Sequence, residues 1–480
     1  MIRKCSIIML LYVFCCTTSS GVSYSASNKQ VVQSSQGDGS SSNVDPDSHS
    51  SGVIDDHTLS SMVAAPMPDA PVLGVAEQMK SLLSSSALQE SLRGLQADEA
   101  RFINEAIHLA EIPAPTFDER AKAETYARML TENGLSDVRI DSTGNVIGVR
   151  RGSGDGPTVA VAAHLDTVFP ASTNVVVRKV GDTLYGPGLT DDSAALALPL
   201  AWLRALNKSG LKTSGDLVIV GTVGEEGNGD LRGIKAFISE NKEVDAVVVL
   251  EPVPPSVALI MNTGSNRYKV TFKAPGGHSY SAFGQVPSAI HAMGRLVAKI
   301  ADMQVPVTPR TTFTVGLVSG GTSVNTIAPD AVVEIDVRSN GNAELQSTSR
   351  KVLQFVDEAV SEENKRWGTK SLSATTEQIG ARPGGMTQPD HPIVSTWMAA
   401  AASQGVKPSM LAGASTDAGV PMSNGIPTIV LGFGGTTGGF HSITENWTTV
   451  DVAKGMTISY LTTIALLGVE GVSEPTTMAK

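Results

Sequence analysis

Continuous apolar runs alternate along much of the chain with segments in which apolar residues recur at helical spacing. A short continuous run fits a strand buried on both faces, and the periodic segments fit amphipathic helices. In residues 138–250 these predicted elements are strands Val138–Ile140, Asn145–Arg150 and Thr158–Ala163, helix Ala194–Asn207, strand Asp216–Thr222, helix Gly233–Ser239 and strand Ala246–Leu250. The alternation predicts an α/β fold with a mostly parallel central sheet covered on both faces.

The pattern changes near residue 262. The predicted elements there are strand Arg267–Lys273, helix Pro287–Ala301, strands Thr311–Ser319 and Ala331–Arg338, helix Glu344–Glu362 and strand Lys370–Ile379. This β-α-β-β-α-β order predicts a small α+β domain inserted into the larger one. Strand Thr428–Gly432 and helix Met456–Leu467 then return to the larger domain, in which helices near Phe102–Ala110 and Ala121–Asn133 precede the first strands.

The first 74 residues differ from the rest in composition. Arg3 and Lys4 precede a short apolar stretch, Cys5–Cys16, and small residues follow as far as Ala26. This is the pattern of an export signal, 1–26, which predicts a secreted or periplasmic protein with no stable membrane span after cleavage; an uncleaved membrane anchor is the alternative. Residues 27–74, rich in Ser, Asp, Gly and Pro, predict a disordered linker. The predicted domains are 75–261 and 376–480 for the catalytic part and 262–375 for the insertion.

The overall composition narrows the classes of function. At 480 residues with 41% hydrophobic and 17% charged residues, the chain fits a globular protein of more than one domain. Its net charge of −11 argues against a nucleic-acid partner, because phosphates would be repelled. All three cysteines lie in the predicted signal, so a metal in the mature chain must be bound by His, Asp and Glu.

Acids and histidines follow the predicted strands. They stand in the short segments His164-Leu-Asp166, Asp191-Asp192, Glu225-Glu226, Glu251-Pro252 and Gly439-Phe-His441. Each segment alone is as well explained by a structural histidine, a helix cap or a solvated turn. Together they predict a ligand site, because parallel strands bring their carboxyl ends to one edge and only a cation would offset that much negative charge.

At these residues the chain resembles the co-catalytic zinc exopeptidases, which include glutamate carboxypeptidase, aminoacylase, peptidase T and succinyl-diaminopimelate desuccinylase. Five blocks match in order over residues 97–470, including Gly188-x-x-Asp191-Asp192 and Gly439-Phe-His441-Ser442. Two positions depart from the pattern. Ser193 stands where many relatives carry Lys after the paired acids, and the ligand at 251 is Glu, which favours carboxypeptidases and deacylases over aminopeptidases.

The resemblance implies two zinc ions, with cobalt or manganese as alternatives. Asp191 would bridge them, His164 and Glu251 would complete one site, and Glu226 and His441 would complete the other. The resemblance also implies that Asp166 orients the His164 ring, that a cis peptide joins Asp191 to Asp192, and that Glu225 is the general base acting on metal-bound water. Imidazole and carboxylate ligands suit Zn²⁺, which fits this assignment.

The inserted domain matches the family's lid and dimerisation domain. His278 would stabilise the developing oxyanion, commonly from the partner subunit of a homodimer. Asn325, Arg338 and, after the lid, Asp417 would contact the substrate. Structural alternatives stay open here, since Asn325 also fits a turn cap and Arg338 also fits an ion pair with a lid acid.

The resulting hypothesis is an exported di-zinc exopeptidase, carboxypeptidase-like or tripeptidase-like, that hydrolyses peptide amide bonds. An N-acyl-amino-acid deacylase is the alternative enzyme, since its chemistry is the same. A non-catalytic binding protein on the same fold is the alternative of another class, and the intact set of ligands with Glu225 disfavours it.

Overall fold

The computed structural model describes residues 66–68, 72–154 and 156–478, which fall within one compact unit. The predicted signal peptide and most of the predicted linker lie outside the described residues. Every helix in the described part is too short or too polar to cross a membrane.

A nine-stranded sheet forms the centre of the larger domain, in the order β1-β2-β6-β3-β7-β17-β8-β15, with β16 also paired to β8. Its strands are β1 Arg139–Ile140, β2 Val146–Arg150, β3 Thr158–His164, β6 Asp216–Thr222, β7 Val244–Leu250, β8 Val257–Asn262, β15 Gly385–Met386, β16 Met410–Ala414 and β17 Thr428–Leu431. The central neighbours β6, β3, β7 and β17 run parallel, which confirms the predicted mostly parallel α/β fold.

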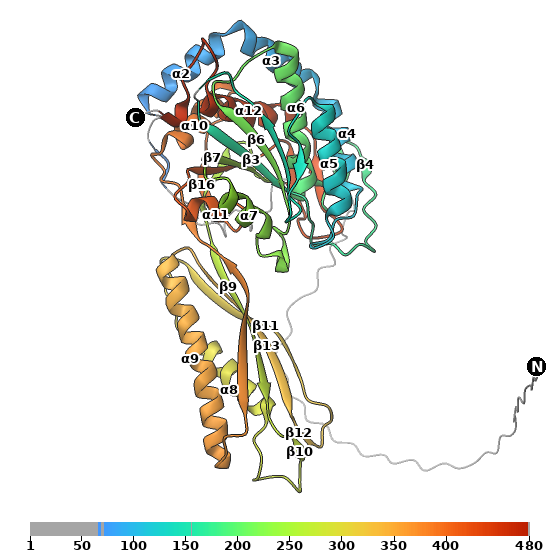
Figure 1. Cartoon of the computed structure of the whole chain (residues 1–480), viewed down its shortest axis with the longest axis vertical. Helices are drawn as coiled ribbons and strands as arrows, with labels where there is room; N and C mark the ends of the chain where they lie inside the picture. The colour runs from blue at the N-terminus through green and yellow to red at the C-terminus, as the bar shows by residue number, and fades with distance from the viewer. Residues whose placement is uncertain (1–65, 69–71, 155, 479–480) are drawn as a thin grey trace, which may run out of the picture. The chain divides into compact units, whose positions relative to one another are not determined.

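Helices cover both faces of this sheet (Figure 1). They are α2 Leu73–Ser84, α3 Ser86–Ala97, α4 Glu99–Ala110, α5 Arg120–Glu132, α6 Ala194–Ser209, α7 Arg232–Glu240, α10 Pro392–Ser403, α11 Gly419–Ser423 and α12 Val452–Leu467. Alternate residues of β3 enter two cores: Val159, Val161 and Ala163 enter one with α6 and α12, and Ala160 and Ala162 the other with α7. This two-sided burial explains why the strand is continuously apolar.

The inserted domain, called the lid below, has the predicted β-α-β-β-α-β order. Its elements are β9 Gly264–Lys273, α8 Ala289–Ala301, β11 Thr311–Gly320, β13 Asp330–Ser339, α9 Asn342–Trp367 and β14 Ser373–Arg382, with the short pair β10 Gly277–His278 and β12 Thr326–Ile327. The sheet order is β11-β13-β9-β14, and all its pairs are antiparallel. Residues such as Val270, Phe272, Val333 and Ile335 pack one face against α8 and α9.

A small four-stranded sheet completes the larger domain. Its strands are β4 Arg178–Val180, β5 Thr183–Tyr185, β18 Thr436–Gly438 and β19 Asn446–Thr448. It joins segments far apart in sequence, since β19 pairs with β5. Trp447 anchors it, with a fully buried ring against Phe102 and Phe433. This sheet positions the loops that carry Asp191 and His441.

Candidate metal centre

The five predicted ligands meet beyond the carboxyl ends of the central strands. His164 ends β3, and Glu251 directly follows β7. Because β3 and β6 are parallel with His164 paired to Thr222, the turn after β6 brings Glu225 and Glu226 to the same edge. Asp191 arrives from the turn before α6 and His441 from the loop between β18 and β19. Register therefore produces the convergence that the sequence only suggested.

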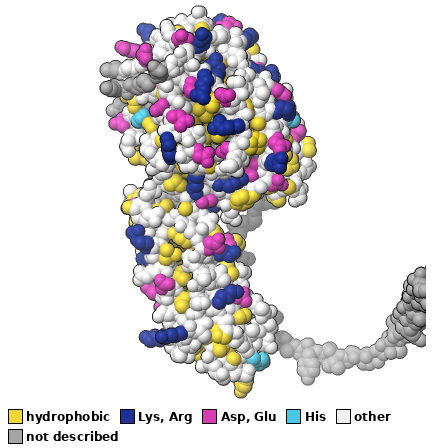
Figure 2. Space-filling view, in the orientation of Figure 1, with side chains coloured by type: hydrophobic (Ala, Val, Ile, Leu, Met, Phe, Trp, Pro, Cys, Tyr) yellow, Lys and Arg dark blue, Asp and Glu magenta, His cyan; other side chains and the backbone are white. Residues whose placement is uncertain are grey.

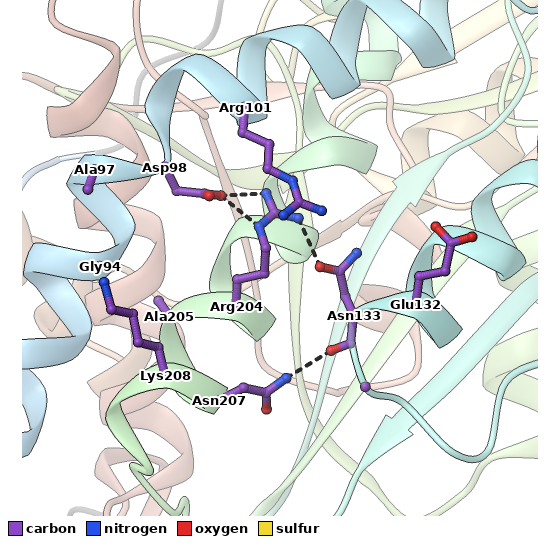
Figure 3. A pocket seen from close by; sticks show the side chains of 11 residues that line it. Gly94, Ala97, Asp98, Arg101, Glu132, Asn133, Arg204, Ala205, Asn207 and Lys208 are labelled. Atoms are coloured by element: carbon purple, nitrogen blue, oxygen red, sulfur yellow. Dashed lines mark hydrogen bonds and ion pairs between the residues drawn. The ribbon is translucent and has the colours of Figure 1, made fainter.

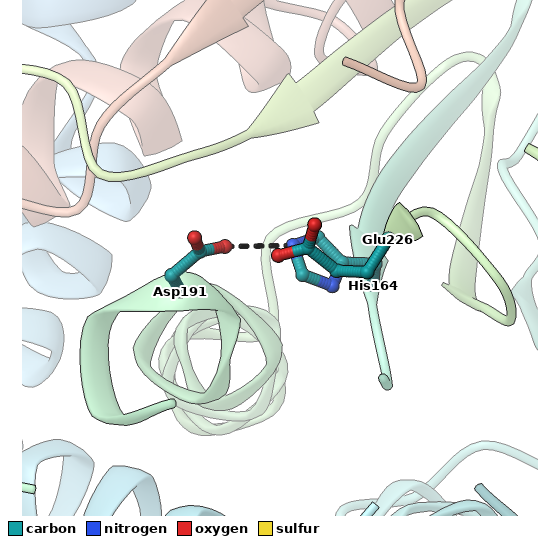
Figure 4. Close-up of side chains that lie close together, drawn as sticks. All are labelled: His164, Asp191 and Glu226. Carbon is teal, nitrogen blue, oxygen red and sulfur yellow. Dashed lines mark hydrogen bonds and ion pairs between the residues drawn. The ribbon is translucent and has the colours of Figure 1, made fainter. Parts of the chain in front are cut away.

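Asp191 lies between two imidazoles, as a bridging ligand would. Its Oδ1 is 2.9 Å from Nε2 of His164, and its Oδ2 is 3.1 Å from Nε2 of His441. The His441 Nε2 is also 3.0 Å from Oε1 of Glu226. Figure 4 shows His164 and Glu226 facing Asp191. The Asp191–Asp192 peptide is cis, as the resemblance implied.

The ligand atoms form two groups that could each hold a cation. One contains His164, Asp191 and Glu226, and the other contains His164, Asp192 and Glu251, with atoms within 4.8 Å of one another in each group. The second group differs from the implied set, because Asp192 accompanies Glu251. Asp192 Oδ2 accepts the His164 backbone N–H at 2.9 Å, whereas its buried Oδ1 has no hydrogen-bond partner.

The titratable groups of the site are buried and crowded, an arrangement that favours a bound cation. Burial, together with repulsion from neighbouring carboxylates, raises the pKa of Asp192 and of Glu251 well above the ordinary range. Hydrogen bonds with Asp191 and Glu226 raise the pKa of His441 to about 10. Burial opposes charge on His164, but contacts with Asp166 and Asp191 still raise its pKa. The donor set of imidazoles and carboxylates therefore fits bound divalent metal.

Asp166 does more than orient the His164 ring. The ring Nδ1 lies 2.9 Å from the backbone oxygen of Asp166 and 3.6 Å from its carboxylate Oδ1. That fully buried carboxylate accepts the backbone N–H groups of Glu225 and Glu226, each at 3.0 Å, and the Thr116 hydroxyl at 2.8 Å. Asp166 thus ties the end of β3 to the turn that carries the predicted base.

Glu225 lies on the wall of the site, in contact with an arginine that sequence reasoning missed. Nη1 of Arg382 donates to Glu225 Oε1 at 3.1 Å, and its Nη2 donates to the Glu225 backbone oxygen. Burial raises the pKa of Glu225 to about 8, although Arg382 opposes this shift. Arg382 was not recognisable in the sequence because it ends β14, 157 residues from the acid it contacts.

Two further buried residues support the paired acids. Glu445 accepts the backbone N–H groups of Gly188, Thr190 and Asp191 at 2.7–3.0 Å and fixes the turn that presents Asp191. Lys122 on α5 is 1% exposed, and its Nζ lies 3.4 Å from Oγ of Ser193. Ser193 occupies the position where many relatives carry Lys, and in this chain the ammonium group next to it belongs to Lys122 of another helix. Burial lowers the pKa of Lys122 to about 8.

A cavity of about 320 Å³ opens over the ligands. It is lined by His164, Val168, Asp191, Glu225, Glu226, Gly227, Glu251, Arg267, Arg338, Arg382, Ser415, Thr416 and His441. The predicted substrate residue Arg338 is among them, and it also pairs with Asp336 at 2.6 Å, so both interpretations of this arginine fit. Asp417 is placed differently from the prediction: its side chain is buried beneath the cavity and accepts the Thr222 hydroxyl, while Ser415 and Thr416 line the wall.

The structure does not bring His278 and Asn325 to this cavity within one chain. They belong to β10 and the turn before β12, where the Ser279 N–H donates to the Asn325 backbone oxygen. Arg267 lines the cavity, and the seven residues of β9 from Arg267 to Lys273 span roughly 20 Å. His278 lies beyond that end of the strand. Asn325 Oδ1 accepts the Ser323 hydroxyl, as a turn residue does.

A second cavity, of about 550 Å³, lies between α3, α4, α5 and α6 (Figure 3). Its polar groups pair with one another: Arg204 contacts Asp98 and Glu105, and the Asn207 side chain donates to the Asn133 backbone oxygen. These contacts explain its polarity as helix packing. On the face shown in Figure 2, acidic and basic side chains are intermixed.

The sequence model of peptidase family M20/M25/M40 matches residues 160–464, which is more than half of the chain. The chain belongs to this family. Succinyl-diaminopimelate desuccinylase of Leptothrix cholodnii is 25% identical over 275 residues, covering 53% of this chain and 69% of the relative. The M20 protein is therefore a metallohydrolase whose relatives are peptidases and deacylases.

Solved structures share the fold of this M20 chain. Aminopeptidase PepT of Bacillus cereus superposes with a TM-score of 0.63 at 22% identity, over 76% of this chain and 99% of that one. The YXEP protein of Bacillus subtilis, a dinuclear metal-binding peptidase of the M20 family, gives a TM-score of 0.55 at 17% identity. The superposition covers 77% of this chain and 99% of that one. At these identities the likeness establishes the fold alone.

Proposed function

We propose that this M20 protein is a di-zinc exopeptidase that cleaves a peptide amide bond next to a free carboxylate. The observation that carries the proposal is the arrangement of Asp191 between His164 and His441, with Glu226 and Glu251 beside them and Glu225 on the wall. When bound, two divalent cations would polarise the substrate carbonyl and lower the pKa of water. Co²⁺ and Mn²⁺ suit the same ligands.

The chain's own residues supply the proton chemistry and the orientation. Glu225 accepts a proton from the attacking water and delivers it to the leaving nitrogen. Arg382 holds the Glu225 carboxylate at 3.1 Å, and Asp166 holds the backbone of the same turn, so the base has one position. Arg338, on the cavity wall, binds the free carboxylate of the substrate.

The experiment that tests this proposal removes the base and leaves the metal ligands. Glu225→Ala and the isosteric Glu225→Gln should bind two zinc ions per chain by elemental analysis and lose amide hydrolysis by about 10²–10⁴-fold. Glu240→Gln, at the exposed end of α7, is the matched control and should keep full activity. Turnover near that of the wild type in Glu225→Gln would refute the mechanism.

An N-acyl-amino-acid deacylase is the alternative that the same site supports, since the leaving group again carries a free carboxylate. A panel of dipeptides, tripeptides and N-acetyl and N-succinyl amino acids separates the two. The exopeptidase proposal requires higher kcat/KM for peptides than for N-acyl amino acids with the same C-terminal residue. The reverse order would establish the deacylase.

We also propose a homodimer in which the lid of one chain supplies His278 to the site of the other. The lid edge strand β11 exposes Leu317 and Val318, whereas the exposed residues of the opposite edge, β14, are polar apart from Ala381. Val318→Lys should shift the dimer to monomer in analytical ultracentrifugation and reduce activity. Thr376→Lys on β14 is the control. A wild type that sediments as a monomer would refute this proposal.

Finally, we propose that the protein is exported, on the basis of the sequence of residues 1–26. N-terminal sequencing of the protein recovered outside the cytoplasm should begin near residue 27. Recovery of the full-length chain only in the cytoplasm would contradict export.

A further inference from the structure

Three arginines meet on one face of the lid sheet, and one of them has no role in the proposed function. Arg338 of β13 and Arg382 of β14 both pair in register with Ser265 of β9. Arg267 follows Ser265 by two residues, so its side chain points to the same face. All three arginines line the cavity over the metal ligands. The face they share is opposite to the one that packs against α8 and α9.

The sheet is built to leave room for Arg267. Its register partner on β14 is Gly380, next to a register shift. A Cβ at Gly380 would lie 3.1 Å from Cδ of Arg267 and 3.3 Å from its Cβ, so a larger residue would crowd the arginine. Ser265, the nearest residue between the three arginines, is also small. Small residues at these places let three long cationic side chains occupy one patch.

The positive charge of this patch is incompletely balanced by the lid. Its carboxylate, Asp336, is held by Arg338 at 2.6 Å and by the Ser265 hydroxyl at 3.0 Å. Arg267 lies 3.5 Å from the same carboxylate, and its Nη1 donates to the uncharged backbone oxygen of Gly227. Arg382 forms an ion pair with Glu225. Arg267 therefore keeps donors available for an anion in the cavity.

The charges around Arg267 affect the pKa of its guanidinium in the direction expected for a patch with excess positive charge. Burial and the nearby cations Arg382 and Arg338 lower the pKa of its guanidinium, although Asp336 opposes the shift. Because an arginine stays charged in proteins, Arg267 is repelled by Arg382 and Arg338, and a bound anion would offset this repulsion. The buried Nε of Arg382 also has no hydrogen-bond partner.

We propose that the site selects substrates whose leaving residue carries two carboxylates, so that the C-terminal residue is Asp or Glu. Arg338 binds the α-carboxylate and Arg267 the side-chain carboxylate. These arginines are diagonal neighbours on adjacent strands, within reach of two carboxylates on one residue. A carboxylate on the acyl part of the substrate would lie on the other side of the scissile bond, away from Arg267. This inference rests on the proposed amide hydrolase function and adds its specificity.

The test compares isosteric substrates that differ only in the second carboxylate. The zinc-loaded enzyme should cleave Ala-Ala-Glu with a kcat/KM about 10–100-fold above that for Ala-Ala-Gln, the value of one charge-assisted hydrogen-bonded pair. N-Acetyl-Glu and N-acetyl-Gln should give the same order. N-Succinyl-Gln, with its extra carboxylate on the acyl side, should gain no such advantage over N-acetyl-Gln. Equal rates for Glu and Gln, or a gain only with the succinyl substrate, would overturn the proposal.

Variants assign the preference to Arg267. Arg267→Gln should bring the Glu/Gln ratio close to one, and Arg267→Lys should leave an intermediate ratio because the charge stays and the fork is lost. Lys269→Gln removes the same charge one step further along the same face of β9 and should keep the wild-type ratio. An unchanged ratio in Arg267→Gln would refute the assignment.

Binding of the products separates this inference from the proposed function. If no peptide or N-acyl substrate is cleaved, the proposed function fails. Titration calorimetry of the zinc-loaded protein with glutamate and with glutamine still measures the same recognition. Tighter binding of glutamate, lost in Arg267→Gln, would support the acidic subsite, and equal affinities would refute it.

Discussion

Asp166→Asn is the substitution whose effect follows most directly from the structure. The carboxylate is fully buried, with Oδ1 accepting the Glu225 N–H and Oδ2 accepting the N–H of Glu226 and the hydroxyl of Thr116. Burial opposes its charge, but its contacts with His164 and Thr116 lower its pKa below the ordinary range, so it is ionised at neutral pH. Asparagine keeps the shape and loses one acceptor and the charge.

The magnitude follows from the lost acceptor. Whichever way the amide is turned, its NH₂ group faces one of the two backbone N–H groups, and a buried donor left without a partner costs about 1–3 kcal/mol. The remaining bonds lose the charge of their acceptor, about 1 kcal/mol more. We expect the free energy of unfolding to fall by about 2–4 kcal/mol. Because His164 and Glu226 then lose their fixed positions, zinc affinity should fall about 10–100-fold.

Urea unfolding of the metal-free protein and competition with a zinc chelator measure the two effects separately. Asp245→Asn is the matched control, because Asp245 also accepts a backbone N–H, that of Thr158 at the opposite, exposed end of β3. It should change stability by less than about 1 kcal/mol and leave zinc affinity unchanged. If Asp166→Asn behaves like this control, the reasoning about the turn is wrong.

Three other predictions concern pH, metal and packing. Burial raises the pKa of Asp417 to about 6 and that of Glu445 to about 7, and hydrogen bonds with Asp191 and Glu226 raise the pKa of His441 to about 10. The folded metal-free protein therefore binds more protons than the unfolded chain, and its urea midpoint should decrease as the pH rises from about 5.5 to about 8.5. A midpoint that increases over this range would contradict these shifts. Added zinc should restore the midpoint at pH 8.5. Glu251→Asp draws the carboxylate back by one methylene and should lower the zinc content from two per chain towards one, whereas retention of both ions would exclude Glu251 as a ligand. Trp447→Phe loses the hydrogen bond to the Gly434 oxygen and part of a fully buried ring, which should cost about 2–3 kcal/mol by urea unfolding; an unchanged midpoint would show that β19 does not depend on this anchor.

Local patterns in the sequence predicted much of the fold correctly. The alternation of apolar runs and periodic segments predicted a mostly parallel central sheet and the six elements of the lid, with ends displaced by a few residues. Helices α2 and α3 were missed, although Leu88, Leu92 and Leu95 recur at helical spacing and are buried. The short strands β18 and β19 of the small sheet were also missed, because a strand of three residues has too little pattern to detect.

The convergence of the five predicted ligands could be foreseen because each follows a strand or a turn of recognisable type, and parallel strands bring their carboxyl ends to one edge. Contacts between distant segments were not predictable in this way. Nothing near Arg382 in sequence indicates that it reaches Glu225, and nothing near Lys122 indicates that it replaces a lysine after Asp192. Asp417 matched a motif, but its side chain turned into the core.

The sequence by itself determined which residues are buried in strands and which chemistry stands at the strand ends, since both depend on residue type and spacing along the chain. Only the tertiary structure decided which side chains share one volume. The register of β9, β13 and β14 places three arginines over the ligands, and the length of β9 keeps His278 away from the ligands of its own chain. Such placements depend on long-range pairing and packing, which leave no periodic signal in the sequence.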